Sequence, residues 1–67
     1  MITVTLNGKA REVERELPIE ALLQLLGIDR RTVAVARNGD IVPRDQYDEV
    51  EVRAGDAIEV VRMVGGG

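Results

Sequence analysis

Cysteine, histidine, tryptophan and phenylalanine are all missing from this 67-residue chain, and Tyr47 is its only aromatic residue. Without cysteine or histidine the chain can form neither disulfides nor the usual zinc sites, and it has no thiolate or imidazole nucleophile. We therefore expect no metal site. A chain of this length forms one small domain, which buries only about 60% of the surface exposed on unfolding. We do not expect a deep catalytic cleft in it.

The chain also lacks a basic field and a long apolar run. Nucleic-acid binding depends mainly on basic charge and on stacking aromatic rings, so a net charge of −3 with a single aromatic residue argues against that class. No stretch approaches the roughly 18 apolar residues of a membrane span, and the N-terminal residues lack the basic and apolar regions of a signal peptide. We expect a cytoplasmic protein that binds neither nucleic acid nor membranes.

Two turn signals divide much of the chain into hairpins. Apolar residues alternate with threonines over 2–6, and Asn7-Gly8 is typical of a two-residue turn, so 9–13 is expected to return as a solvated edge strand. A β-branched run over 32–37 followed by Asn38-Gly39 predicts a third strand and a second tight turn.

Between the hairpins the sequence predicts one helix. Pro18 suits the first helical position, and apolar residues recur at the i, i+3, i+4 and i+7 positions of one face, namely Ile19, Leu22, Leu23 and Leu26. Gly27 is expected to end the helix in a left-handed conformation, with Ile28 folding back onto the last turn. Leu17 offers no side-chain acceptor as a cap, so we expect the helix to begin frayed or supported by a loop.

The last third of the chain predicts a loop and two strands. Pro43 has no backbone N–H and is expected at an edge or turn. The polar stretch 44–48 that follows is expected to be a loop or a single helical turn. A short strand is predicted over 49–52, and the most apolar strand over 57–64.

Together these elements predict an α+β fold of the ubiquitin-like β-grasp type, in which one helix covers a mixed sheet of four to five strands. The folded domain is expected to span 1–64 and to be followed by a flexible glycine tail over 65–67. The expected core consists of apolar residues on the covered face of the sheet and on the helix, namely Ile2, Val4, Leu6, Val13, Ile19, Leu22, Leu23, Leu26, Val33, Val35, Ile41, Val50, Ile58 and Val60.

The glycine run Gly65-Gly66-Gly67 directly follows the last predicted strand. Glycine has no Cβ, so an enzyme could close around such a tail and bring its terminal carboxylate to the α-phosphate of ATP. Attack there would give an acyl-adenylate, which a sulfur or nitrogen nucleophile could then open. The simpler interpretation is a flexible end without chemistry, since glycine-rich termini are commonly just flexible.

The chain resembles the ubiquitin-like sulfur-carrier proteins, and most closely the ThiS family of thiamin biosynthesis. The resemblance covers all 67 residues. Besides the order of elements it rests on Asn38-Gly39, Ile41-Val42-Pro43-Arg44, the aromatic Tyr47, the turn Ala54-Gly55-Asp56, Ile58 in the last strand, and the end Val64-Gly65-Gly66-Gly67.

This resemblance implies a protein substrate rather than an enzyme. Gly67 would be adenylated by a ThiF-like adenylyltransferase that uses ATP and Mg, and then converted to a thiocarboxylate with sulfur from a cysteine desulfurase or rhodanese-type donor. A ThiG-like thiazole synthase would consume that sulfur in building the thiazole of thiamin. Gly66 carries over as part of the family's Gly-Gly end, whereas Gly65 stands where the family tolerates other small residues. The chain itself would bind no cofactor.

A surface for these partners is expected beside the tail. If Ile58 and Val60 face the core, Val61 and Met63 fall on the open face of the sheet and form an apolar patch that leads to the glycines. Scattered surface apolar residues are the competing interpretation. Arg62 could pair with an acid on the activating enzyme, although a solvated arginine is commoner.

Acidic residues gather over 45–51, but we do not expect them to form a metal or acid–base site. They lie in loop and edge positions, without a histidine or an apolar pocket to shift a pKa, and a solvated acidic face accounts for them; the residues are Asp45, Asp48, Glu49 and Glu51.

Three other functions stay open. A MoaD-like small subunit of molybdopterin synthase, or another sulfur carrier, would use the same tail chemistry. A β-grasp interaction module would not use the tail at all. A protein modifier would join the tail to other proteins through isopeptide bonds, as ubiquitin does.

Overall fold

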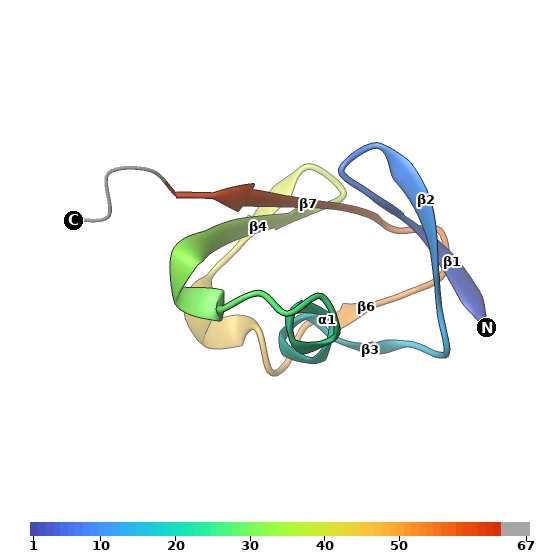
Figure 1. The fold of residues 1–67 in the computed structure, drawn as a ribbon, viewed down its shortest axis with the longest axis horizontal. Coiled ribbons are helices and arrows are strands. Elements are labelled where there is room, and N and C mark those ends of the chain that lie inside the picture. Colours follow the sequence, from blue (N-terminus) through green and yellow to red (C-terminus); the bar gives the residue numbers. More distant parts are fainter. Residues whose placement is uncertain (64–67) are drawn as a thin grey trace.

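The computed structural model describes residues 1–63, which form a five-stranded mixed sheet with one α-helix packed across one face (Figure 1). The order of strands in this sheet is β2-β1-β7-β4-β5, and only the central pair β1 and β7 is parallel. The strands are β1 (Ile2–Leu6), β2 (Lys9–Val13), β4 (Val33–Arg37), β5 (Asp40–Val42) and β7 (Ala57–Arg62). The predicted β-grasp arrangement is confirmed.

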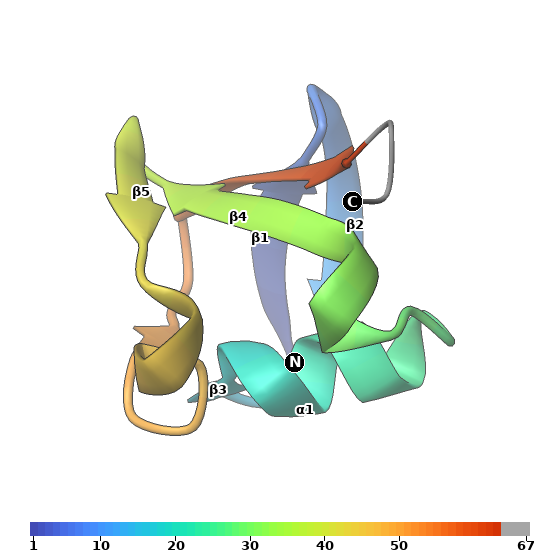
Figure 2. The ribbon, with the colours of Figure 1, turned by 90° about the vertical axis from the view of Figure 1, so that its left-hand side faces the viewer.

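The other elements lie on the covered side of this sheet (Figure 2). A second sheet pairs two strands of two residues each, which the sequence analysis did not foresee as a pair. These elements are β3 (Leu17–Pro18), α1 (Ile19–Leu25), β6 (Glu51–Val52) and two 3₁₀ turns, η1 (Arg30–Thr32) and η2 (Arg44–Gln46). The single helical turn predicted after Pro43 is therefore confirmed as η2.

Both predicted hairpins are present, and their turns have the backbone that two-residue hairpin turns require. Asn7 and Gly8 have φ angles of 49° and 83°, and Asn38 and Gly39 have φ angles of 52° and 88°. Positive φ at both central positions matches the twist of the flanking strands. As expected, β2 is an edge strand, and its only buried residue is Val13.

The helix begins one residue later than the sequence predicts. Pro18 has a ψ of 153° and is the N-cap rather than the first helical residue, because Leu17 and Pro18 pair with β6 and keep an extended backbone. The expected support by a loop is confirmed. The backbone N–H groups of Ile19 and Glu20 donate to the carbonyls of Val50 and Tyr47, each at 3.0 Å. These bonds satisfy donors that a helix start leaves without partners.

As predicted, Gly27 stops α1 in a left-handed conformation, with a φ of +72°. The last helical residue is Leu25, and Leu26 is the C-cap. The N–H of Gly27 donates to the carbonyl of Gln24 at 3.1 Å, and the N–H of Ile28 donates to the carbonyl of Leu23 at 2.9 Å. This pair of bonds is the Schellman motif, and the side chain of Ile28 packs against the core as its hydrophobic contact.

The core forms between the sheet and α1 and contains most of the expected residues. Ile41 is the exception: its side chain is 72% exposed, so its predicted place in the core is wrong. The two-residue turn pairs Val35 with Val42 and Ala36 with Ile41, which puts Val42 on the core face and Ile41 on the other. Four buried residues were missing from the expected core, namely Leu17, Val42, Tyr47 and Val52.

Candidate functional site

Strand β7 leads to the predicted tail, and it lies in the middle of the sheet, between β1 and β4. It ends at Arg62, two residues before the predicted end of the strand, although the N–H of Met63 still donates to the carbonyl of Thr32 at 2.9 Å. The predictions for Gly65, Gly66 and Gly67, and for Val64 as the end of the folded domain, lie outside the described residues. They stay predictions.

The asparagines of both hairpin turns hold β7 in place with their side chains. The amide of Asn7 accepts from the N–H of Val60 at 2.8 Å and donates to the carbonyl of Val60 at 3.2 Å. Asn38 accepts from the N–H of Ala57 at 2.8 Å. Because Asn7 reproduces the pairing of a peptide unit, it extends the contact between β1 and β7 beyond the end of β1. The strand that leads to the tail is thus fixed from both sides.

Exposed apolar side chains lie near the end of β7 on the open face of the sheet, which is turned away from α1 in Figure 1; Glu59, which pairs with Ala36, lies on the same face. Val61 is 61% exposed and Met63 is 45% exposed, as expected. Ala34 pairs with Val61, and the neighbouring Ala36 pairs with Ile41 on its other side. We call this set the outer patch: Ala34, Ala36, Ile41, Val61 and Met63. Ile41 enlarges the patch across β5, and counting residues across the Asn38-Gly39 turn would have placed it there.

A second group of side chains comes from the end of β7 and from the turns η1 and η2. Arg62 is exposed, which fits both a residue that pairs with a partner and a solvated arginine, so its predicted role stays a prediction. The sequence analysis did not select Arg44 as a site residue, but its Nη2 lies 3.9 Å from Sδ of Met63. Arg44 belongs to the segment Val42-Pro43-Arg44. Nothing in the sequence around it indicates a contact with Met63, which lies 19 residues further along the chain.

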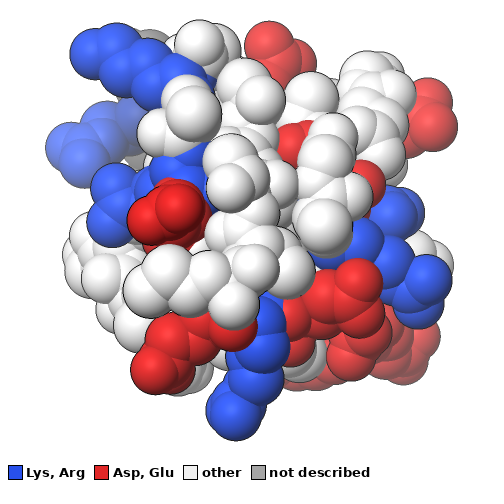
Figure 3. All heavy atoms as spheres, turned by 90° about the vertical axis from the view of Figure 1, so that its right-hand side faces the viewer, with Lys and Arg blue, Asp and Glu red and all other residues white. Residues whose placement is uncertain are grey.

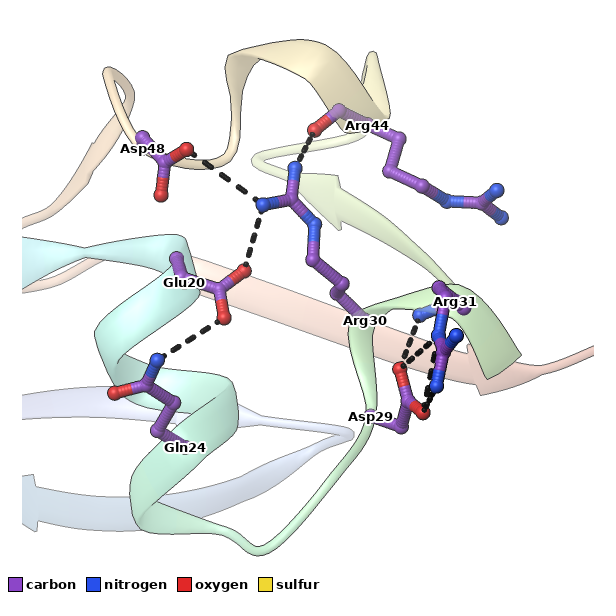
Figure 4. Close-up of polar contacts among 7 residues, drawn as sticks. All are labelled: Glu20, Gln24, Asp29, Arg30, Arg31, Arg44 and Asp48. Carbon is purple, nitrogen blue, oxygen red and sulfur yellow. Dashed lines mark hydrogen bonds and ion pairs between the residues drawn. The ribbon is translucent and has the colours of Figure 1, made fainter.

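Arg30 links α1, η1 and η2 (Figure 4). Its Nη1 lies 3.2 Å from a carboxylate oxygen of Glu20 and 3.6 Å from one of Asp48, and its Nη2 donates to the backbone carbonyl of Arg44. The guanidinium also lies 5.4 Å from the centre of the buried Tyr47 ring, within the range of a cation–π interaction. Arg30 therefore fixes η2, and with it the start of the Arg44 side chain.

The neighbouring Arg31 is paired within its own turn. Its Nη2 donates to Oδ2 of Asp29 at 2.9 Å, and its backbone N–H donates to Oδ1 of Asp29 at 2.9 Å. The side-chain hydrogen bond from Arg31 is the main cause that lowers the pKa of Asp29 to about 2. Asp29 is the N-cap of η1, so this ion pair also stabilises the turn that precedes β4.

The turn at Gly55-Asp56, one of the segments behind the family resemblance, has a structural role. Asp56 is buried, and its carboxylate accepts hydrogen bonds from Arg37, Asn38 and the backbone N–H of Arg53. Burial by itself raises the pKa of Asp56, but these hydrogen bonds outweigh it, and the pKa lies below its usual value. The carboxylate fixes the loop that precedes β7.

The acidic residues over 45–51 are spread over exposed positions. Asp48 faces Arg30, and Glu51 lies 4.0 Å from Arg53. Within residues 1–63, no three acidic side chains come together in a way that could hold a metal ion. No helix in the same range is long and apolar enough to cross a bilayer.

At the opposite end of the molecule, near the N-terminus, a groove lies between the end of β2 and α1. Its walls include the exposed side chains of Met1 and Leu25, and charged residues of both signs surround it, including Arg11, Glu14 and Arg15. Figure 3 shows this end, where acidic and basic side chains border a central area of uncharged residues. The N-terminus and the end of β2, which border this groove, lie at the right of Figure 1, whereas β7 ends at the left.

The sheet order, the single helix and the central strand that leads to the chain end define a ubiquitin-like β-grasp domain. The family model described as "ThiS family" matches residues 4–67, so the chain belongs to the ThiS family. It is 38% identical to the sulfur carrier protein ThiS of Bacillus subtilis over 63 residues, which cover 92% of this chain and 96% of that protein.

Solved structures and longer proteins are similar as well. A crystal structure of the thiamine biosynthesis protein ThiS from Geobacter metallireducens superposes with a TM-score of 0.87 and 33% identity, covering 98% of this chain and all of that one. A thiazole synthase of Paramagnetospirillum magneticum is 45% identical over 64 residues. These cover 96% of this chain but only 20% of the thiazole synthase, and a second thiazole synthase, from Magnetococcus marinus, is matched over the same share.

Proposed function

We propose that this chain is a sulfur carrier of thiamin biosynthesis, a protein substrate rather than an enzyme. The observation that carries the proposal is the family match, which extends over 4–67 and so includes the three glycines. The identity to the Bacillus sulfur carrier, over nearly the whole of both chains, supports the same role. The two thiazole synthases among its relatives favour the thiamin pathway over a MoaD-like role in molybdopterin synthesis.

The proposed chemistry takes place at the carboxylate of Gly67. A ThiF-like adenylyltransferase, with its own ATP and Mg, catalyses attack of this carboxylate on the α-phosphate, which releases pyrophosphate and leaves an acyl-adenylate. The terminal sulfur of a persulfide on a cysteine desulfurase or rhodanese-type donor then adds to the carbonyl, and AMP leaves. A second thiol on the partner attacks the resulting acyl disulfide, forms a disulfide with the donor cysteine and so releases the acyl sulfur. The product is a thiocarboxylate, whose sulfur a ThiG-like thiazole synthase consumes. Gly65 and Gly66 would let the partner's channel close around the backbone.

The folded part of the chain would present the tail and a docking surface. The outer patch includes Val61 and Met63, at the end of the strand that leads to the tail, so a partner that takes up the tail can contact the patch at the same time. We propose that the adenylyltransferase covers Val61, Met63 and Ile41, with Arg62 at the border of the contact. Exposed apolar side chains grouped on one sheet face are typical of such docking surfaces, and Met63 can adapt to more than one partner.

The chemistry can be tested by incubating the chain with a ThiF-like adenylyltransferase, ATP, Mg and a sulfur donor, and then weighing it intact. We expect the mass gain of one oxygen replaced by one sulfur, and an AMP adduct when the donor is left out. A chain that lacks Gly67 is the control and should gain neither. If the full chain gains no mass with any cognate adenylyltransferase, the proposed function is wrong.

The docking surface can be tested with Ile41→Asp and Val61→Asp. We expect each change to slow adenylate formation by about tenfold or more, since a charge at the centre of an apolar contact is costly to desolvate. Leu25→Asp is a matched control, because Leu25 is 65% exposed against 61% for Val61 but lies on α1, beside the far groove. If all three variants fold and react at the same rate, the patch does not dock the enzyme.

A further inference from the structure

Four arginines surround the point where the chain leaves the sheet. Arg30 and Arg31 lie in η1, Arg44 lies in η2, and Arg62 is the last residue of β7. The backbone bond from Met63 to Thr32 brings the end of β7 against the end of η1, and the contact between Arg44 and Met63 brings η2 to the same place. Arginines from three separate segments therefore converge on one exit.

Two of these four arginines have a carboxylate within ion-pair distance and two do not, although the charge of Arg44 also helps to lower the pKa of Asp29. Arg30 has Glu20 and Asp48 within ion-pair distance, and Arg31 has Asp29. Arg44 and Arg62 make no ion pair with any carboxylate in residues 1–63. In Figure 4 the guanidinium of Arg44 extends away from the ion pairs of Arg30 and has no dashed line to a carboxylate.

The position of Arg44 is determined by the fold rather than left to solvent. Its backbone carbonyl accepts hydrogen bonds from Nη2 of Arg30 and from the N–H of Tyr47. Tyr47 is 1% exposed and anchors η2 in the core. A rigid backbone and a contact with Met63 thus hold a positive charge beside the exit, on a molecule whose net charge is −3.

We propose that Arg44 and Arg62 form a basic pair that binds carboxylates of the activating enzyme, at the opening through which the tail enters. This inference depends on the proposed function. Beyond that function, it states that the partner surface is negatively charged and that Arg44, which has no part in the tail chemistry, contacts it. Two guanidiniums with no carboxylate of residues 1–63 within ion-pair distance complement a partner surface that carries carboxylates. Guanidinium–carboxylate pairs also have well-defined geometry.

The partner group is a protein carboxylate rather than the phosphates of the nucleotide. Four residues follow Met63 in the sequence, and an extended chain advances about 3.4 Å per residue, so the reacting carboxylate can be about 14 Å beyond Met63. A guanidinium at the exit is then too far from the α-phosphate. It lies instead at the rim of the partner's channel, where charges mainly determine the rate of encounter and the choice of partner.

The test is the kinetics of binding to the ThiF-like adenylyltransferase for Arg44→Gln, Arg62→Gln and the double variant, at several salt concentrations. We expect the association rate constant of the double variant to fall by about tenfold at low salt, with a weaker salt dependence and a smaller change in the dissociation rate. Arg15→Gln is the matched control, because it removes the same charge beside the far groove. It should change the association rate less than twofold.

Different results identify what has failed. If the wild-type chain is neither bound nor adenylated, the proposed function itself is wrong. If the wild-type chain is adenylated and the double variant binds with the kinetics of Arg15→Gln, only the basic pair is overturned. Thermal unfolding of each variant checks the fold. Arg44→Gln should change the midpoint little, because within residues 1–63 the Arg44 guanidinium makes one hydrogen-bond contact, with Met63, and beyond it only a longer-range attraction to Asp29.

Discussion

Nε of Arg37 donates a 2.7 Å hydrogen bond to Oδ2 of Asp56, which lies 19 residues further along the chain. Arg37 ends β4, and Asp56 immediately precedes β7. The same carboxylate accepts from the N–H of Arg53 at 2.8 Å and from the amide of Asn38 at 3.1 Å. This one side chain therefore connects the start of β7 to the turn between β4 and β5.

Replacing Asp56 should destabilise the fold strongly. Asp56→Ala leaves the Arg37 guanidinium and two other donors without their charged acceptor in a partly buried place, and we expect a loss of about 2 to 4 kcal/mol in the free energy of unfolding. Urea denaturation measures it. Asp45→Ala is the control, because Asp45 is exposed, and it should change stability by less than about 0.5 kcal/mol. Similar losses in both variants would contradict the role of Asp56.

The same carboxylate should make stability depend on pH. The pKa of Asp56 is lower in the folded chain than in the unfolded one, because the hydrogen bonds from Arg37, Arg53 and Asn38 outweigh the effect of burial. Its contribution is therefore complete above the unfolded value of about 3.9 and is lost as the pH falls through the lower folded value. Unfolding of the wild type and of Asp56→Asn should differ most near neutral pH and converge in strong acid. A constant difference down to strong acid would contradict this linkage.

Asn7 should stabilise the fold through both its backbone and its side chain. Asn7→Ala removes two hydrogen bonds to Val60 and places alanine at a φ of 49°, so we expect a loss of about 2 to 3 kcal/mol. Asn7→Gly relieves the backbone but still lacks the amide, and should recover about 1 kcal/mol of that loss. Chemical denaturation of the two variants separates the contributions. Equal losses would mean that the left-handed backbone costs nothing here.

Gly27 allows a measurement of backbone strain alone. Its φ is +72°, and a Cβ added there would meet no heavy atom within 4 Å. Gly27→Ala should therefore destabilise the chain by about 1 to 2 kcal/mol through the left-handed backbone and not through a clash. Gly27→Asn should cost less, since asparagine tolerates this conformation better. The thermal midpoints of the two variants check this order, and the reverse order would contradict it.

The neighbours Ile41 and Val42 should respond in opposite ways to truncation. Val42 is 7% exposed and Ile41 is 72% exposed. We expect Val42→Ala to destabilise the chain by about 1 to 3 kcal/mol, because it leaves a cavity, and Ile41→Ala to change stability by less than about 0.5 kcal/mol. Equilibrium unfolding of the two variants shows whether Val42 or Ile41 faces the core. A larger loss at Ile41 would return this residue to the core and remove it from the outer patch.

Local signals predicted much of the fold, and they failed where burial depends on distant segments. Asn38-Gly39 specifies its turn through backbone conformations that few residue pairs adopt, and Gly27 specifies the helix end for the same reason. Tyr47 lies in a polar stretch, so no local pattern shows that it is buried beneath Arg30. Leu17 and Val52 were missed because they pair across more than thirty residues of sequence, in strands of only two residues each.

The same division applies to the candidate site. By itself the sequence determined the absence of thiolate and imidazole nucleophiles, the three glycines and the alternation that exposes Val61 and Met63, because composition and strand period are local properties. Tertiary structure alone decided that β4 pairs with β7, which brings Ile41 onto the same sheet face as Val61, and that Arg44 reaches the exit of β7. The first depends on strand register, because a shift of the pairing by one residue would move each strand side chain to the other face of the sheet. The second depends on a turn that is packed against residues far away in the sequence.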